Sequence, residues 1–315
     1  MTTFLRALQE AGEHGAEQVE HAAEAVQHGA EQAAGGTPDI GGMLMHHLAD
    51  AHEIELPWGV WHLPQWEPLH LGGLTIDLSP TKHVVFMLLA GIIVCAMFLL
   101  MARAVRGKYA GKAPGGMSSA LEAMIIYFRD EIVRRNIGHG ADGYTPFILT
   151  LFFFILTMNL LGLVPWGASP TGNIMVTGAL ALCSLVAIEV SGFVALGPAG
   201  YAKTIFYAPK GMGPVGTAIM LVIMTPVELV GKIAKPFALM VRLFANMTAG
   251  HTVILSLIGL IFVFGHMTIG RWGVAAGSVG MSVAMMMLEI FVAFLQAYIF
   301  AMLTSVFIGL IRHAH

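Results

Sequence analysis

The chain has 315 residues, of which 57% are hydrophobic and only 11% are charged. This composition excludes an ordinary soluble domain and is typical of a polytopic membrane protein. The formal net charge of −3 conceals an asymmetry, because twelve of the nineteen acidic residues precede Lys82, whereas Arg6 is the only base before it.

Residues 4–34 have the composition of a polar, alanine-rich helix. A seven-residue repeat places three histidines on one face of it, His14, His21 and His28. Neighbouring histidines would lie about 10 Å apart, too far for one ion to bridge. We therefore favour a solvated acidic helix or a disordered extension over a metal-binding or pH-responsive strip. The pattern of a cleavable signal peptide is lacking, so none is expected.

Residues 43–80 are rich in histidine, tryptophan and proline. Tryptophans at this density just before an apolar span suit the headgroup region of a bilayer, so we expect an ordered cap on the membrane surface. The alternative is a metal site built from His46, His47 and His52. We predict neither a metal nor a cofactor, and we assign residues 1–80 to an acidic N-terminal extension on the outer side.

The channel domain, residues 81–315, begins with an apolar span at about 83–102. An amphipathic segment follows at 117–137. Bases gather in the loop that contains this segment, which places the loop in the cytoplasm and the N-terminus outside. There are seven of them: Arg103, Arg106, Lys108, Lys112, Arg129, Arg134 and Arg135.

Residues 144–188 carry no formal charge and are interrupted by a Pro- and Gly-containing turn. They predict two spans, at about 145–165 and 174–196, joined by a tight turn on the outer side. Cys95 and Cys183 fall within predicted spans and are expected to be small core residues rather than disulfide partners or metal ligands.

Residues 216–264 are apolar and are interrupted only by Pro226 and Pro236. As one helix this stretch would be about 73 Å long, more than twice the hydrocarbon thickness of a bilayer. It is therefore either strongly tilted or divided into two half-spans. A last span at about 275–311 completes five, so the C-terminus is cytoplasmic. The fold class is an all-α polytopic membrane protein with five spans and one amphipathic helix.

Arg242 lies inside this apolar sequence. A guanidinium at membrane depth costs at least roughly 2.5–3.5 kcal/mol, and arginine does not escape by losing its proton. It should face a protein interior, a water-filled cavity or a partner's carboxylate. Asn246 and Glu228 share its side of the helix, at four and fourteen residues, while His251 points to the other side. A titratable track beside one fixed charge indicates ion conduction.

Two motifs resemble subunit a of the F-type rotary ATP synthase, in the order of that family. The first is Lys235-Pro-x-x-Leu-x-x-Arg242-Leu-Phe-x-Asn246-Met-x-Ala-Gly-His251, and the second runs from Glu289 through Gln296 to Thr304. The resemblance covers residues 82–312. It implies a long tilted hairpin of the last two helices in a bacterial inner membrane, and a channel subunit that is not catalytic by itself.

The resemblance also implies a mechanism with two half-channels and a rotating c-ring. Arg242 would separate the half-channels and keep the facing ring carboxylate ionised. Peripheral stalk b subunits and lipid are the other expected partners, and no nucleic acid is. The choice between H⁺ and Na⁺ is made chiefly on the ring, so both stay open. Entry would pass Asn173, Asn159, His251, Glu289 and Gln296, with Asn246 beside Arg242, and exit would pass Glu228.

Many bacterial members of the family have an acid at the position of His251 and a histidine at that of Glu289. The present chain has them exchanged, as in the mitochondrial type. If the two side chains meet across the hairpin, the exchange preserves a Glu–His relay.

Two other classes of protein are weighed against this one. A secondary transporter with a buried Arg/Glu/His site would show two related halves, and no repeat of the spans is visible. An intramembrane metalloenzyme would need a cluster such as H-E-x-x-H, which the chain lacks.

Overall fold

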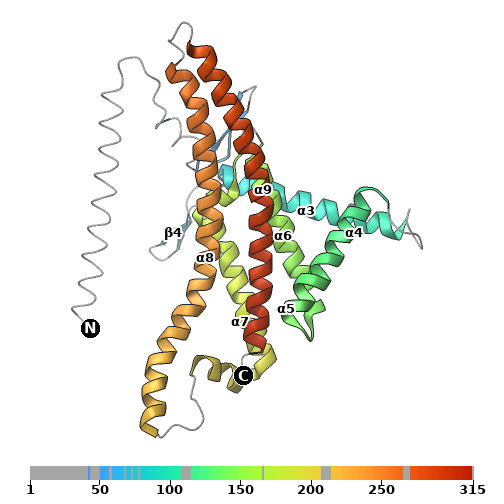
Figure 1. Ribbon diagram of the computed structural model, residues 1–315, viewed down its shortest axis with the longest axis vertical. Coiled ribbons are helices and arrows are strands. Elements are labelled where there is room, and N and C mark those ends of the chain that lie inside the picture. The colour runs from blue at the N-terminus through green and yellow to red at the C-terminus, as the bar shows by residue number, and fades with distance from the viewer. Residues whose placement is uncertain are drawn as a thin grey trace, which may run out of the picture. The chain divides into compact units, whose positions relative to one another are not determined.

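The computed structural model describes residues 42, 50–56, 59–66, 69–71, 74–76, 79–107, 115–164, 167–206, 214–264 and 270–313, most of them helical (Figure 1). The predicted all-α polytopic fold is confirmed, because five helices are long and apolar enough to cross a membrane. They are Lys82–Arg106, Ala141–Gly162, Ile174–Ile205, Gly216–Val263 and Trp272–Arg312.

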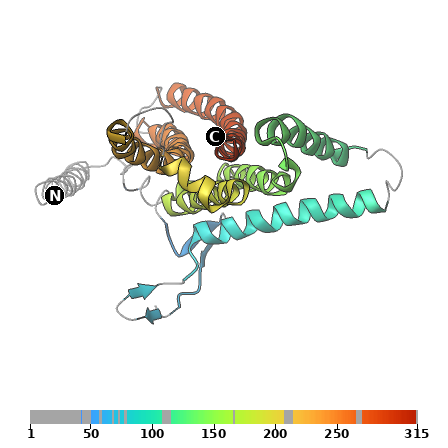
Figure 2. The ribbon, with the colours of Figure 1, turned by 90° about the horizontal axis from the view of Figure 1, so that it is seen from below.

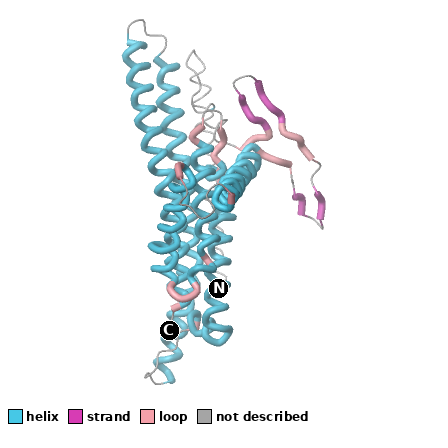
Figure 3. Tube along the Cα trace, turned by 90° about the vertical axis from the view of Figure 1, so that its right-hand side faces the viewer, coloured by secondary structure: helices cyan, strands magenta, loops and turns pink. Residues whose placement is uncertain are grey.

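The chain divides into two compact units. The smaller unit joins Met1–Ala49 to Gly250–Met286, and the larger one joins Asp50–Ala249 to Met287–His315. Within the smaller unit, the end of α8 (Pro214–Val263) and the beginning of α9 (Gly270–Arg312) run side by side (Figures 1 and 3). The predicted histidine repeat, together with His46 and His47, lies outside the described residues.

Two short antiparallel hairpins precede the first span, shown in magenta in Figure 3. These strands are not expected from the sequence. The first is explained by the alternation Glu53-Ile54-Glu55-Leu56, which has the period of a strand and turns Ile54 inward, where it is 7% exposed. The strands are β1 (Glu53–Leu56) with β2 (Gly59–His62), and β3 (Leu69–Leu71) with β4 (Leu74–Ile76).

In the larger unit α3 (Lys82–Arg106) runs across the direction of the C-terminal part of α9 (Figures 1 and 2). The amphipathic segment follows α3 as α4 (Met117–Tyr127), the π-helix η1 (Phe128–Arg134) and α5 (Arg135–Ile137). Arg134 fixes the corner that leads to the next span. It donates from Nε and Nη2 to both oxygens of Asp142, at 2.8 and 3.0 Å. Hydrogen bonds from Arg129, and then from Arg134, lower the pKa of Asp130 below its ordinary value.

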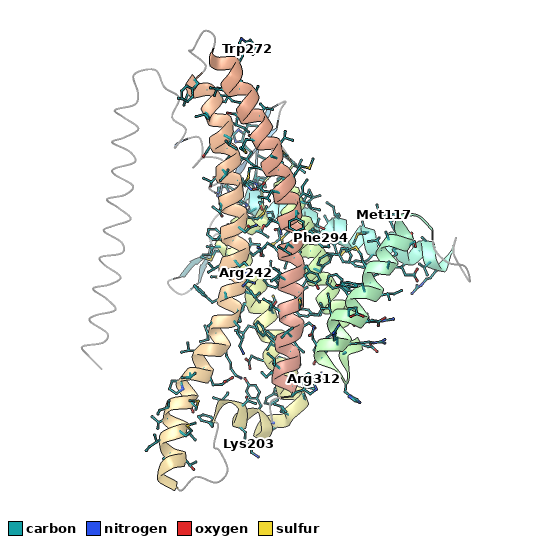
Figure 4. All side chains as sticks on the ribbon, viewed as in Figure 1. Met117, Lys203, Arg242, Trp272, Phe294 and Arg312 are labelled. Atoms are coloured by element: carbon teal, nitrogen blue, oxygen red, sulfur yellow. The ribbon has the colours of Figure 1, made fainter. Side chains whose placement is uncertain are left out.

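The core of the larger unit surrounds α6 (Thr145–Gly162). Phe152 is fully buried and its ring lies 4.4 Å from that of Phe128 and 5.5 Å from that of Phe294, which Figure 4 labels on α9. Aromatic contacts of this kind join the amphipathic segment, α6 and α9 into one packed layer.

The helix α7 (Ile174–Ile205) breaks at Gly197, whose φ of 67° favours glycine, and Pro198 follows. The helix resumes as far as Ile205, so it continues beyond the predicted span of about 174–196. By contrast, α8 is continuous over 50 residues, although it contains Pro226 and Pro236. The expectation that Cys95 and Cys183 are core residues is wrong, because both thiols are free and exposed.

Candidate functional site

Arg242 lies beside the face by which α8 packs into the larger unit. That face is a stripe of Leu239, Leu243 and Met247, which are 3%, 1% and 3% exposed and recur at the helical spacing of four. Arg242 itself is exposed, and Val241 beside it is 36% exposed. Figure 4 labels Arg242 on α8.

The guanidinium of Arg242 makes no hydrogen bond or ion pair with any residue that the structure describes. Helix geometry turns it about 100° away from the buried Leu243. The fold therefore leaves a permanent cation on the open side of an apolar helix, where water or a partner must solvate it.

Asn246 and Glu228 accompany Arg242 along α8. Because the helix is unbroken over Pro214–Val263, the predicted spacing holds, and both lie about 60° from Leu243 in the same sense as Arg242. Asn246 is half-buried and Glu228 is exposed. Polar side chains thus follow one flank of the helix toward its N-terminal end.

Glu289 lies on the buried stripe of α9. It is 7% exposed, and Ala293 and Ala297, four and eight residues on, are 1% and 0% exposed. Gln296 is half-buried on the same helix. His251 is half-buried in the smaller unit, whereas Glu289 belongs to the larger one, so their pairing stays a prediction.

Asn159 is fully buried on α6 and its amide is held from both sides. Nδ2 donates to the carbonyl oxygen of Ala293, at 3.2 Å, one turn beyond Glu289. Oδ1 accepts from the Thr171 hydroxyl at 2.7 Å. Since that hydroxyl proton is committed, Ser169, whose Oγ lies 3.0 Å from Thr171, must donate to Thr171.

Asn173 begins α7 on the other side of the turn. Its Oδ1 accepts from the backbone N–H of Met175 at 2.9 Å, which caps the helix. Its Nδ2 donates to Asp50 at 3.2 Å, and the other oxygen of Asp50 lies 3.9 Å from Nε2 of His83. We call this group the turn cluster: Asp50, His83, Asn159, Ser169, Thr171 and Asn173.

A cavity of about 240 Å³ opens between α7, α8 and the end of α9. Glu228, Lys235 and Phe307 are among its lining residues. On one wall Lys232 donates to Glu189 at 3.0 Å and to the hydroxyl of Tyr201 at 3.1 Å, while that hydroxyl donates to the same carboxylate. Glu228 thus lines the same cavity as three side chains that are hydrogen-bonded to one another, Glu189, Tyr201 and Lys232.

Sequence reasoning missed several of these polar residues. Lys232 has a partner inside the chain, because it pairs with Glu189 at 3.0 Å. That pair could have been suspected, because a carboxylate inside an apolar span needs a partner. Asp50 and His83 gave no such signal, since a pair 33 residues apart is made only by the fold. Among the described residues, no group of His, Cys, Asp and Glu could hold a metal ion.

The described residues thus form two polar regions in an apolar helical body, in addition to the guanidinium of Arg242. The turn cluster lies where α3, α6 and α7 meet, and the cavity with Glu228 lies near the last turn of α9. Titratable and hydroxyl groups at hydrogen-bonding distances can hold water and pass protons. The arrangement is suited to carrying small cations rather than to covalent catalysis.

Comparisons with known proteins find a family model and relatives that match most of the chain. The family described as ATP synthase A chain matches residues 84–309. The ATP synthase subunit a of Chloroherpeton thalassium is 43% identical over 84% of this chain and 75% of its own length. That of Chlorobium phaeobacteroides is 42% identical over 96% and 85%. That of Myxococcus xanthus is 42% identical over 82% and 88%.

Proposed function

The chain belongs to the ATP synthase A chain family, and we propose that it is the proton-translocating subunit a of an F-type ATP synthase, without a catalytic centre of its own. The protein is a multi-pass membrane protein. In this proposal it serves a rotary enzyme in a bacterial inner membrane. The expected partners are a c-ring, peripheral stalk b subunits and lipid.

The exposed, unpaired guanidinium of Arg242 carries the proposal. Exposed apolar side chains lie on the same stretch of α8, among them Phe237 at 58% and Val241 at 36% exposure. A surface of this kind suits an apolar partner helix that brings one carboxylate to the charge. A cation within about 4–6 Å favours the ionised carboxylate, so a ring carboxylate would lose its proton as it passes.

The two polar regions supply the proposed half-channels. Protons would enter past Asn173 and Asn159, then past His251, Glu289 and Gln296, and reach the ring. The side chain of Asn246 would line the path near Arg242. After rotation they would leave past Glu228, and the cavity of about 240 Å³ beside it gives water a place there. Arg242 would prevent direct passage from one route to the other.

Replacing Arg242 tests this function. We expect Arg242→Ala to abolish ATP-driven proton pumping in inverted membrane vesicles while the passive proton leak stays unchanged or rises, because the charge that separates the routes is lost. Pumping is followed with a pH-sensitive dye, and leak is measured without ATP. Leu100→Ala, which trims an apolar side chain that is 64% exposed on α3, is the control and should pump like the parent. Normal pumping in Arg242→Ala would refute the mechanism.

A further inference from the structure

His83 is a buried imidazole for which the proposed pathway has no role so far. It stands in the first turn of α3 and is 5% exposed. Within the described part of the chain, nothing forms a hydrogen bond with its Nδ1. A buried polar atom without a partner costs free energy, so its retention requires an explanation such as bound water.

Asp50 connects this imidazole to solvent. One carboxylate oxygen lies 3.9 Å from Nε2 of His83, and the Asp50 side chain is 34% exposed. The other oxygen accepts from Nδ2 of Asn173. A separation of 3.9 Å is too long for a direct hydrogen bond but fits a transfer through one water molecule or a small movement.

On its other side His83 meets the turn between α6 and α7. The backbone of Ser169 lies against the imidazole, and α3 packs on the short helix η3 (Pro170–Gly172). From Ser169 the hydroxyls lead through Thr171 to Asn159 and the Ala293 carbonyl. Ser169 and Thr171 are 7% and 0% exposed, so polar groups continue through otherwise apolar packing.

The position of His83 and Asp50 at one end of α3 predicts the side of the membrane on which they lie. His83 begins α3, and Arg103 and Arg106 end it. The 25 residues of the helix separate its ends by about 37 Å. If the basic end is cytoplasmic, His83 and Asp50 lie at the outer surface.

We propose that Asp50 and His83 form the proton entry site of the outer half-channel. This inference rests on the proposed function. Asp50 takes a proton from outer water and passes it to Nε2 of a neutral His83. The resulting imidazolium releases its Nδ1 proton to water held along the Ser169 and Thr171 hydroxyls. One proton enters and one leaves, and a ring flip or exchange with water restores the starting tautomer.

The charges around the imidazole come from few elements. Asp50 lies on the segment before β1, and Lys82 precedes His83 on α3. His52 lies nearby, with its Nδ1 3.3 Å from the carbonyl oxygen of Pro80. η3 contributes no titratable group. Asp50 is thus the carboxylate beside the imidazole, and Lys82 is the nearby base.

The test uses the complete ATP synthase in liposomes, with the outer face of subunit a toward the lumen. ATP synthesis is measured against luminal pH at constant external pH and constant electrical potential. We expect His83→Ala to lower the rate at neutral luminal pH by about tenfold, less than the 10²–10⁴ of a catalytic base, because water partly substitutes. Imidazole in the lumen should restore part of the rate. Asp50→Asn, which keeps the shape of the carboxylate, should also lower the rate of ATP synthesis at neutral luminal pH.

The control is His52→Ala, which removes a neighbouring histidine and should leave the pH profile unchanged. Parent-like rates and profiles in His83→Ala and Asp50→Asn would overturn the entry site, and so would a rate loss in His83→Ala that imidazole does not relieve. If His83→Ala fails to assemble, the dependence of ATP synthesis on luminal pH is measured in His83→Gln and Asp50→Asn instead, and parent-like profiles in both would overturn the entry site. Arg242→Ala distinguishes the failure of the proposed function from the failure of the entry site. Normal ATP synthesis in Arg242→Ala would refute the proposed function. If Arg242→Ala is defective while His83→Ala and Asp50→Asn are like the parent, only the entry site is refuted.

Discussion

Two basic residues on α8, Lys232 and Arg242, differ in burial and in pairing. Lys232 pairs with Glu189 at 3.0 Å and its side chain is only 11% exposed, so its charge is neutralised inside the chain. Arg242, ten residues on, is exposed and pairs with none of the described residues. The charge of Lys232 is compensated inside the chain, whereas a guanidinium on an apolar face without such a partner must be solvated by water or by a partner outside the chain.

His251 and Glu289 give a prediction at the same scale. If they form one proton relay, His251→Glu alone places two carboxylates together and should impair conduction, because like charges at close range resist ionising together. Adding Glu289→His restores an acid–imidazole pair and should recover part of the rate. The measurement is ATP-driven pumping in vesicles at matched subunit levels. Equal and severe loss in single and double variants would refute the pairing.

At the scale of the elements, the end of α9 is fastened to the amphipathic segment. Ser305 donates to the carbonyl oxygen of Ile132 at 3.2 Å, and Arg312 donates to that of His139 at 2.8 Å. Between these contacts Gly309 faces the carbonyl of Asn136 so closely that a Cβ would collide with backbone atoms. The approach of two helical segments here depends on the missing side chain.

Gly309→Ala should therefore destabilise the protein by about 1–3 kcal/mol, the usual cost of overpacking, since the clash is with backbone and not with a flexible side chain. Gly280→Ala on the same helix is the control, because a Cβ there meets nothing within 4 Å. It should leave the stability unchanged or raise it by up to about 1 kcal/mol through helix propensity. The thermal midpoint of the purified complex reports both changes. Equal midpoints would show that the two segments can separate without cost.

At the scale of the whole molecule, the distribution of charge along the chain predicts an orientation in the membrane. The acidic N-terminal residues and β1 precede α3, whereas the basic amphipathic segment follows it. Since α3 is long enough to cross the bilayer, β1 and α4 belong on opposite sides. The bias of bases toward the cytoplasm then predicts that α4 lies inside.

Labelling of single cysteines tests this orientation. In a chain with Cys95→Ser and Cys183→Ser, which removes both exposed thiols, we expect Glu53→Cys to react with a membrane-impermeant maleimide in right-side-out vesicles. Met117→Cys, at a position 78% exposed, should react only in inverted vesicles. Labelling of Met117→Cys from the outer side would reverse the orientation and the direction of both half-channels.

The sequence by itself determined the class of protein, the five spans and the family motifs around Arg242, because hydropathy and helical spacing are local properties. Through the family resemblance it also named Asn159 and Asn173 as residues of the expected entry path. Only the tertiary structure decided that Asn173 meets Asp50, that His83 is buried beside them, and that Lys232 neutralises Glu189. These contacts join residues 33 to 123 positions apart, and such pairs form only when packing brings distant helices together. The strands β1 to β4 were missed for a related reason: they are short, and only pairing makes them strands.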